Sequence, residues 1–139
     1  VHDAARPLIA KAWVQQVFAA AAQDGAAILA NPVTSTLKRV GPDRRIGETI
    51  PREHLWEAQT PQVARREWLL DAFAKRGALP ATDEAFLLEH AGYPVTIVPG
   101  SPINLKITTA EDYRIAEKLL SLVPEERKSG LFHPFADED

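Results

Sequence analysis

The chain of 139 residues contains no cysteine and no methionine, and it has no long uninterrupted hydrophobic segment. Without cysteine it can form neither a disulfide framework nor a thiolate nucleophile or metal site, and such a composition suits a reducing compartment. The longest apolar runs are far shorter than the ~20 residues that a helix needs to cross a bilayer. We therefore expect a soluble protein of the cytoplasm.

Several motifs of known chemistry are also missing. The four histidines show no metal-ligand spacing, no serine nucleophile motif is present, and these residues contain no glycine-rich phosphate loop. Acyl transfer and zinc chemistry therefore lose support. The formal net charge of -3 gives no general attraction to nucleic acid, so any anion-binding site has to come from a local cluster of basic residues.

The composition that remains is that of a folded globular protein, with 45% hydrophobic and 25% charged residues. A chain of this length is expected to form one domain with one core. Because the chain starts at Val1 and lacks methionine altogether, we expect it to be a piece of a longer protein.

Hydrophobic periodicity predicts that helices and strands alternate along the chain. Apolar stripes and short β-branched runs, bounded by glycine and proline, define these elements. Helices are predicted over residues 7–24, 64–76, 83–91 and 109–120, strands over 26–30, 94–98 and 103–108, and a hairpin with a turn of more than two residues over 34–50. Such an order implies an α/β sheet covered on both faces, with the hairpin as an outlying element.

Local signals refine three of these elements. Thr82 is the expected N-cap of its helix, and Thr108 with Glu111 forms the capping box of the last one. In the predicted strand 103–108, Asn104, Lys106 and Thr108 alternate with apolar residues. The polar side chains of this strand should therefore share one face.

The predicted hairpin is unusually basic for a mildly acidic protein. Guanidinium groups clamp phosphate in a bidentate way, which favours a phosphate-binding hairpin. The alternative is that the cations protect an exposed hairpin from pairing edge to edge with other chains. Five of the sixteen basic residues of the chain are found here: Lys38, Arg39, Arg44, Arg45 and Arg52.

Three further charged residues are candidates for a site. Asp3 follows what looks like the end of a strand, where open α/β sheets bind ligands, and an acid there could hold magnesium against phosphates. Arg6 precedes a proline, which favours extended geometry and would project its guanidinium from the same edge. Helix capping or a surface ion pair explains these two residues equally well, and Lys106 could equally be a solvated residue of a half-exposed strand.

Taken together, five stretches carry a distinctive resemblance: VHDAARP, NPVTSTLKR, LWEAQTPQV, TDEAFLLEHAG and VPGSPINLKITTAEDYRIAE. In this order they resemble the 2-C-methyl-D-erythritol 4-phosphate cytidylyltransferases of non-mevalonate isoprenoid biosynthesis, from Val1 to about Leu120. The resemblance implies a Rossmann-like, glycosyltransferase-A-like nucleotidyltransferase sheet. It also implies that a sugar-alcohol phosphate attacks CTP in the presence of magnesium, and that the hairpin is an arm of a homodimer.

The resemblance also implies roles for individual residues. Asp3 matches the acid that binds the metal and the substrate, and Ala4 matches a residue beside the cytidine ribose. Arg52 and Lys106 match the catalytic pair that places the substrate phosphate. Residues matching the rest of the methylerythritol phosphate site are Arg6, Thr36, Thr60 and Thr82.

On the same grounds, residues 1–123 correspond to the C-terminal half of the enzyme domain, with the arm at about 31–54, and residues 124–139 form a charged tail. The family's glycine-rich nucleotide loop lies in an N-terminal half that is missing before Val1, so this piece alone should be inactive. Some members of the family continue after the tail into a cyclase domain.

Two other functions stay open at this point. One is a cytidylyltransferase for a related polyol phosphate such as ribitol 5-phosphate, whose site would share the acid, the arm and the lysine. The other is an RNA-binding module that uses the basic hairpin, for which base stacking would need exposed aromatic residues near the arginines. Trp56 is the only aromatic residue close to them in the sequence.

Overall fold

The computed structural model describes residues 1–124, so the predicted tail lies outside the described residues apart from Pro124. Helices and strands alternate along most of this length, as the periodicity predicts. The elements are α1 (Lys11–Asp24), β1 (Ala26–Pro32), β2 (Leu37–Val40), β3 (Ile46–Ile50), β4 (Trp56–Ala64), α2 (Arg66–Lys75), α3 (Glu84–His90), β5 (Thr96–Pro99), α4 (Ala110–Leu119) and the 3-10 turn η1 (Leu120–Leu122).

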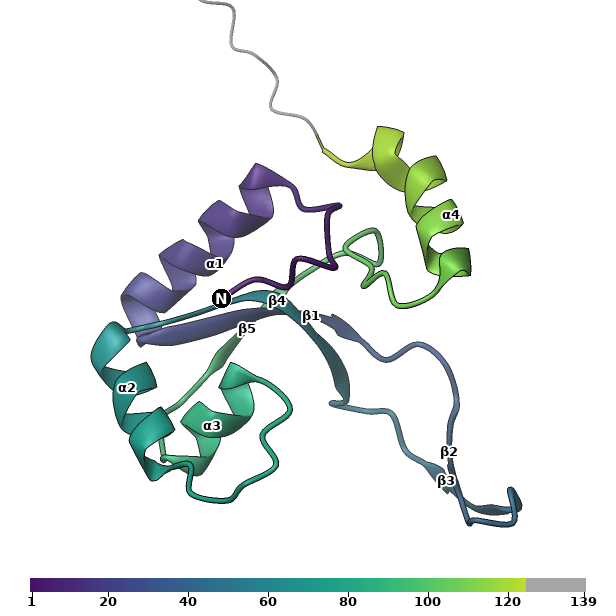
Figure 1. The fold of residues 1–139 in the computed structure, drawn as a ribbon, viewed down its shortest axis with the longest axis horizontal. Helices are drawn as coiled ribbons and strands as arrows, with labels where there is room; N and C mark the ends of the chain where they lie inside the picture. The colour runs from purple at the N-terminus through teal and green to yellow at the C-terminus, as the bar shows by residue number, and fades with distance from the viewer. Residues whose placement is uncertain (125–139) are drawn as a thin grey trace, which may run out of the picture.

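The main sheet has the strand order β4-β1-β5, with β1 antiparallel to β4 and parallel to β5. Helix α1 covers one face of this sheet, and α2 and α3 cover the other (Figure 1). The predicted α/β architecture with two covered faces is therefore confirmed.

Strand β1 is the centre of both cores. Its residues 26–31 are all buried, which its small, apolar sequence AAILA allows at close approach of helices. Successive side chains of a strand point to opposite faces, so Ala27 and Leu29 pack with Val17 of α1. Ala26 packs on the other face with Leu87 and other residues of α2 and α3.

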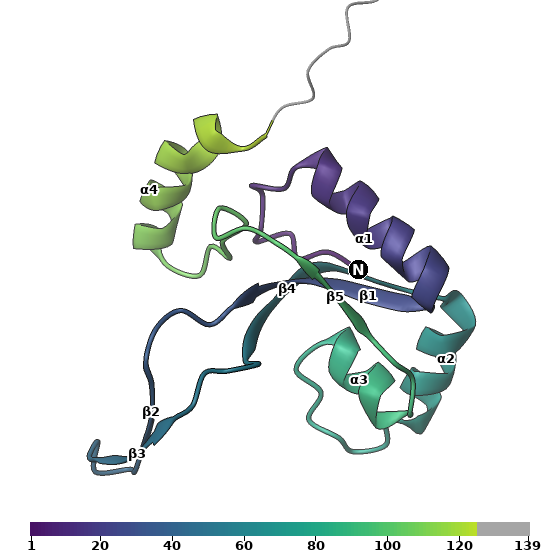
Figure 2. The ribbon, with the colours of Figure 1, turned by 180° about the vertical axis from the view of Figure 1, so that it is seen from behind.

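The predicted hairpin is also confirmed. Strands β2 and β3 pair antiparallel across a turn of five residues, 41–45, and this ribbon projects away from the main sheet (Figures 1 and 2). Its residues are almost all exposed. We call residues 31–54 the arm.

Strand β4 is an element that the sequence pattern does not predict. Its sequence contains Pro61 and the polar residues Gln59, Thr60 and Gln62, which do not give the apolar alternation of a strand, although proline is tolerated in a strand that lies at the edge of the sheet, as β4 does. In the structure these residues are buried, and the pairing of β4 with β1 shifts register between Ile28 and Ala30, the stretch that faces Pro61. The irregularity accommodates a residue without an N–H.

The strand predicted over residues 103–108 is wrong. This segment is a turn followed by irregular chain, with hydrogen bonds from Asn104 N–H to Ser101 O and from Leu105 N–H to Ile103 O. Asn104 is fully buried instead of sharing an exposed polar face with Lys106. The alternation misleads because Asn104 binds polar groups of β4 in the interior.

Helix starts are displaced from the predicted positions. Helix α1 begins at Lys11 rather than at Pro7, because residues 7–10 form no helix, Ala10 is extended, and Leu8 and Ala10 are buried. Asp83, not Thr82, caps α3, since its carboxylate accepts the N–H of Phe86.

The last helix has the predicted kind of cap one residue later, with Thr109 and Asp112 as the capping box instead of Thr108 and Glu111. The carboxylate of Asp112 accepts bonds from both threonines, led by the Thr108 hydroxyl, which lowers the pKa of Asp112 to about 2. Helix α4 itself lies apart from the sheet in both views (Figures 1 and 2). Of its predicted apolar stripe only Ala116 is buried.

Among residues 1–124, every helix is too short or too polar to cross a bilayer.

Gly25, at the junction of α1 and β1, provides a test of this packing. It has φ +96°, and a Cβ built on it would lie 2.2 Å from Cη2 of Trp68. Replacing Gly25 by alanine should lower the free energy of unfolding by about 2 to 4 kcal/mol, since backbone strain and overpacking add. Urea denaturation of the two proteins measures the difference.

Gly92→Ala is the matched control. Gly92 has φ +88°, but a Cβ there meets nothing within 4 Å. It should cost only the backbone strain, about 1 kcal/mol. Equal losses in the two variants would show that Trp68 does not limit the space at Gly25.

Candidate functional site

A cluster of three charged side chains lies at one edge of the sheet. Lys106 Nζ is 3.1 Å and Arg6 Nε is 3.5 Å from the same carboxylate oxygen, Oδ2 of Asp3. Asp3 and Arg6 belong to the segment before α1, and Lys106 to the loop after β5. The fold thus brings together residues from opposite ends of the described chain.

Main-chain hydrogen bonds hold these two segments in place. Val1 exchanges two bonds with Gln62 of β4, so that the first residue is paired like a strand residue although residues 1–10 form no strand. The sequence predicts that Asp3 follows the end of a strand, but the structure has no strand before Asp3. Further along, the N–H of Ile107 donates to Ala5 O over 2.8 Å, which ties the loop that carries Lys106 to the segment that carries Asp3.

Thr60 supports the backbone of this segment. Its hydroxyl accepts the N–H of Asp3 at 3.0 Å and lies 2.8 Å from His2 Nδ1. The other ring nitrogen of His2 is 3.0 Å from Arg6 O. Since a carbonyl only accepts, His2 Nε2 carries a proton and donates to Arg6.

His2 is a residue for which the sequence predicts no role. Its contacts on both sides of Asp3 depend on how the chain turns, and no spacing signal in the sequence indicates them.

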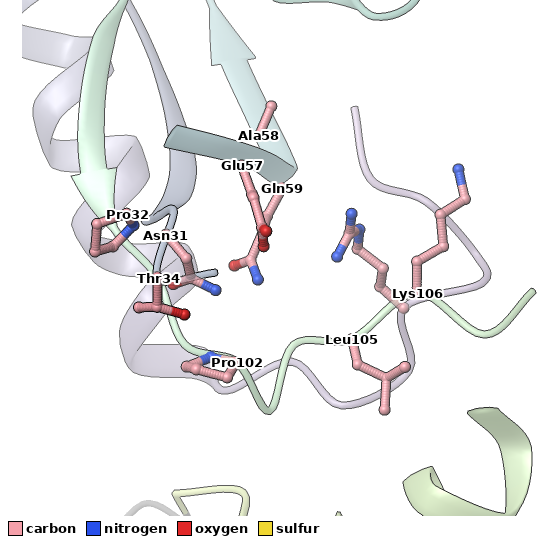
Figure 3. Close-up of a pocket in the computed structure, with 11 residues that line it drawn as sticks. Asn31, Pro32, Thr34, Glu57, Ala58, Gln59, Pro102, Leu105 and Lys106 are labelled. Carbon is pink, nitrogen blue, oxygen red and sulfur yellow. The ribbon is translucent and has the colours of Figure 1, made fainter. Parts of the chain in front are cut away.

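Two cavities meet at the charged cluster. The larger, of about 570 Å³, extends toward the base of the arm (Figure 3). The smaller, of about 270 Å³, extends toward the start of α3 and includes Asp3, Thr60 and Thr82. The residues that line both cavities are Arg6, Ala58, Gln59 and Lys106.

The larger cavity has amides and apolar side chains facing its cations. Asn31 and Thr34 lie on one side of it and Leu105 and Lys106 on the other, with Gln59 between them (Figure 3). Asn31 and Gln59 are both buried. The arrangement offers amide groups and two cations, and the only carboxylate among the residues that line this cavity is that of Glu57.

The electrostatics of the cluster keep Asp3 ionised. The hydrogen bond from Lys106, more than the charge of Arg6, lowers the pKa of Asp3 below its ordinary value of 3.8. The Asp3 carboxylate and the Lys106 ammonium remain partly exposed, whereas the Arg6 side chain is only 13% exposed. The Arg6 guanidinium is anchored by its Nη1, which donates to Asn104 O at 2.6 Å.

The structure brings together five of the eight residues that the sequence predicts for the site. The remaining ones line neither cavity: Ala4 is exposed in the turn after Asp3, and Thr36 and Arg52 lie in the arm. Arg52 donates to Thr34 O within the arm. The five that surround the cavities are Asp3, Arg6, Thr60, Thr82 and Lys106.

Two other cations of the arm form ion pairs with acidic residues of the arm itself. Arg39 pairs with Glu48 across the ribbon, and Arg45 lies 3.5 Å from Asp43 in the turn. Neither Arg39 nor Arg45 lines one of the two cavities. Arg52 differs from them, because its guanidinium donates to a main-chain carbonyl rather than to a carboxylate.

Comparison with known proteins adds to this geometry. The family model of 2-C-methyl-D-erythritol 4-phosphate cytidylyltransferase matches residues 1–122. The chain belongs to this family. Its fold class and the resemblance seen in the sequence motifs are thereby confirmed.

The relatives show how much of the family's length this chain spans. It is 49% identical over 121 residues to the cytidylyltransferase of Salinibacter ruber, covering 86% of this chain and 50% of the relative. It is 48% identical over 120 residues to a bifunctional IspD/IspF enzyme of Desulfotalea psychrophila, covering 86% and 31%. The chain thus spans about half the length of the monofunctional relative and about a third of the bifunctional one.

A solved structure gives the same result in three dimensions. The crystal structure of the cytidylyltransferase from Thermus thermophilus superimposes with a TM-score of 0.79 at 38% identity, covering 87% of this chain and 60% of that one.

The ion pair between Lys106 and Asp3 is directly testable. Replacing Lys106 by alanine should raise the pKa of Asp3 toward 3.8, since the largest cause of its lowering is removed. The carboxyl carbon of Asp3, followed by NMR as the pH falls, reports this value. In the native protein the stabilisation from the pair persists above pH 3.8 and is lost as the pH falls through the lowered pKa.

Lys75→Ala serves as the control. Lys75 pairs with Asp71 at 2.6 Å in α2, and its loss should leave the titration of Asp3 unchanged. A pKa of Asp3 that is the same with and without Lys106 would contradict the proposed pairing.

Proposed function

We propose that this chain forms the substrate-phosphate side of a cytoplasmic cytidylyltransferase that converts 2-C-methyl-D-erythritol 4-phosphate and CTP to 4-diphosphocytidyl-2-C-methyl-D-erythritol and pyrophosphate. The observation that carries the proposal is the junction of two cavities at Arg6 and Lys106, opposite Asp3, in a member of this family. The cysteine-free composition suits a reducing compartment.

The reaction needs positioning and charge neutralisation more than covalent help. An oxygen of the substrate phosphate attacks the α-phosphorus of CTP, and pyrophosphate leaves with the electrons of the broken bond. Two phosphates must approach each other, so their repulsion has to be screened. We propose that Lys106 binds the attacking phosphate with Arg6 beside it, which its half-exposed side chain and its position in the lining of both cavities support.

Magnesium is the cation that this chemistry requires, and we propose Asp3 as its protein ligand. Among residues 1–124 no cluster of three or more acidic or histidine side chains could hold a metal by itself. A single carboxylate nevertheless fits magnesium, which keeps several waters and binds mainly through one or two carboxylates and the substrate phosphates. Asp3 would hold the ion at the cavity, and the ion would neutralise part of the phosphate charge.

Arg52 is assigned to the site of a second copy of the chain. Within one chain it lies in the projecting arm and lines neither cavity. Two exposed arms that exchange between protomers would bring each Arg52 to the other's Lys106 in an isologous dimer. The exposure of the arm and its projection from the sheet support this assignment (Figure 2).

Substitution of the two proposed phosphate-binding cations tests the function. In the complete gene product that carries this sequence, Lys106→Ala and Arg52→Ala should each reduce transition-state stabilisation by about 2 to 4 kcal/mol. Pyrophosphate release from CTP and methylerythritol phosphate measures kcat/KM, and chelation of magnesium should stop it. Lys38→Ala is the control, because it removes an arm cation that bonds Thr49 within the ribbon.

The choice of substrate is decided in the same assay. Preference for ribitol 5-phosphate over methylerythritol phosphate would overturn the proposed substrate. Near-normal turnover in both Arg52 and Lys106 variants would overturn the assignment of these residues.

Mixing the two variants tests the exchange of arms. If Arg52 acts on the partner's site, a mixed dimer has one site with both defects and one intact site. After unfolding and refolding an equal mixture, about a quarter of the native activity should return. No recovery, in a mixture shown by mass spectrometry to contain mixed dimers, would place Arg52 and Lys106 in the same protomer's site.

A further inference from the structure

Asn104 occupies a central place beneath the charged cluster, although no role has been assigned to it. It is fully buried, and it lies two positions before Lys106 in the loop after β5. We propose that Asn104 is a positioning residue that sets the places of Lys106 and Arg6. The inference rests on the function proposed above, since it concerns how the same two cations are held.

The side chain of Asn104 joins the loop to β4. Its Nδ2 donates to Thr60 O at 2.9 Å and to Gln59 Oε1 at 3.2 Å. These two bonds use both of the amide's donor hydrogens. The loop is thereby fixed to the strand whose Thr60 also holds the backbone of Asp3.

The main chain of Asn104 holds Arg6. Its carbonyl oxygen accepts Arg6 Nη1 at 2.6 Å, the contact that anchors the guanidinium beside Asp3. The position of this carbonyl follows from that of the Asn104 side chain. One residue thus links the loop, β4 and the segment before α1.

Gln59 completes the connection from the side of β4. Its Nε2 donates to Ser101 O at 2.9 Å, at the start of the loop, and lies 3.4 Å from Asn104 O. A Cβ at residue 100 would lie 2.4 Å from Gln59 Oε1, so glycine at this position leaves the Gln59 amide in its place. The loop is therefore held at Ser101 and Asn104 by a pair of interlocked amides.

Lys106 lies between two fixed points of the chain. Asn104 is bound on one side of it, and on the other the N–H of Ile107 donates to Ala5 O. Since Lys106 itself is about half exposed, packing does not hold its side chain in place. Its direction depends instead on the ion pair with Asp3 and on the backbone that these bonds hold.

The incomplete bonding of Asn104 argues against a role in the core alone. Its Oδ1 is buried and has no hydrogen-bond partner among the described residues. An unpaired buried acceptor is unfavourable, and an apolar residue of similar shape would avoid it. The amide is therefore explained by the two bonds that it donates and by the loop position that they impose.

A double-mutant cycle in the complete gene product tests the inference. Asn104→Ala should reduce kcat/KM for methylerythritol phosphate by between about tenfold and a hundredfold, because a small displacement of a positioning group has effects of this size. In the Lys106→Ala background the same substitution should cost several-fold less, since only Arg6 is then left to be displaced. Equal losses in both backgrounds would show that Asn104 does not act through Lys106.

A second readout does not depend on turnover. Hydrogen exchange of the Ile107 amide should accelerate at least about tenfold in Asn104→Ala, because the loop loses its anchor, while amides of β1 keep their protection. Val17→Ala, which removes methyl groups from the core on the α1 face, is the stability control. This control should leave hydrogen exchange at Ile107 unchanged, and it should reduce kcat/KM by the same factor with and without Lys106.

A substitute variant and the exchange readout allow the inference to be tested even if Asn104→Ala does not fold or the proposed function fails. If Asn104→Ala does not fold, Gln59→Met removes the partner amide and should give the same pattern of coupling and exchange. If Lys106→Ala turns over normally, the proposed function fails, and exchange at Ile107 still shows whether Asn104 fixes the loop. Unchanged exchange in Asn104→Ala, or in Gln59→Met in its place, would overturn the inference.

Discussion

The burial of β1 on both faces is the constraint on which the rest of the structure depends. A strand covered by α1 on one side and by α2 and α3 on the other must be flanked by strands that satisfy its main chain, and β4 and β5 do this. Because β5 is parallel to β1, their carboxyl ends lie at the same edge, where Gly100 N–H donates to Ala30 O at 2.8 Å. Ligands of open α/β sheets bind at this kind of edge, and here the two cavities form.

The positive charge is concentrated where the two cavities meet, since the other acidic residues lie further along them, Glu57 in the larger cavity and Asp83 and Glu84 in the smaller. One carboxylate, that of Asp3, faces two cations, and its ionised state is maintained by the hydrogen bond from Lys106. The cluster therefore keeps an excess of positive charge at the junction of the cavities. A phosphate that binds there would compete with Asp3 for Lys106, and a cation on Asp3 would leave the lysine to the phosphate. Metal and substrate binding would then favour each other.

Much of the fold could be predicted from local patterns. The apolar run of β1 is typical of a buried strand, and the arm contains two β-capable runs on either side of a turn. Both elements are present in the structure as predicted. Strand β4 could not be predicted in this way, because Pro61 and its polar neighbours are accommodated by a register shift and by partners distant in the sequence.

The prediction of a strand over residues 103–108 was wrong for a related reason. A hydropathy pattern does not distinguish a buried amide such as that of Asn104 from an exposed one. The site itself was predicted mainly through the resemblance of motifs. The residues alone suggested Asp3, Arg6 and Lys106 as charged candidates, but no periodicity indicates that a residue near the start contacts one near the other end of the described chain. His2 and Asn104 were missed because their importance lies in hydrogen bonds that exist only in the folded chain.

The contact between Gly100 and Gln59 also restricts how this protein can diverge. The constraint at Gly100 is one of space rather than of backbone conformation, since an added methyl group would collide with the end of the glutamine side chain. Enlargement of residue 100 would therefore displace the Gln59 amide from its partners unless residue 59 became shorter. We expect substitutions at these two positions to be correlated across homologous sequences, although the positions lie far apart along the chain.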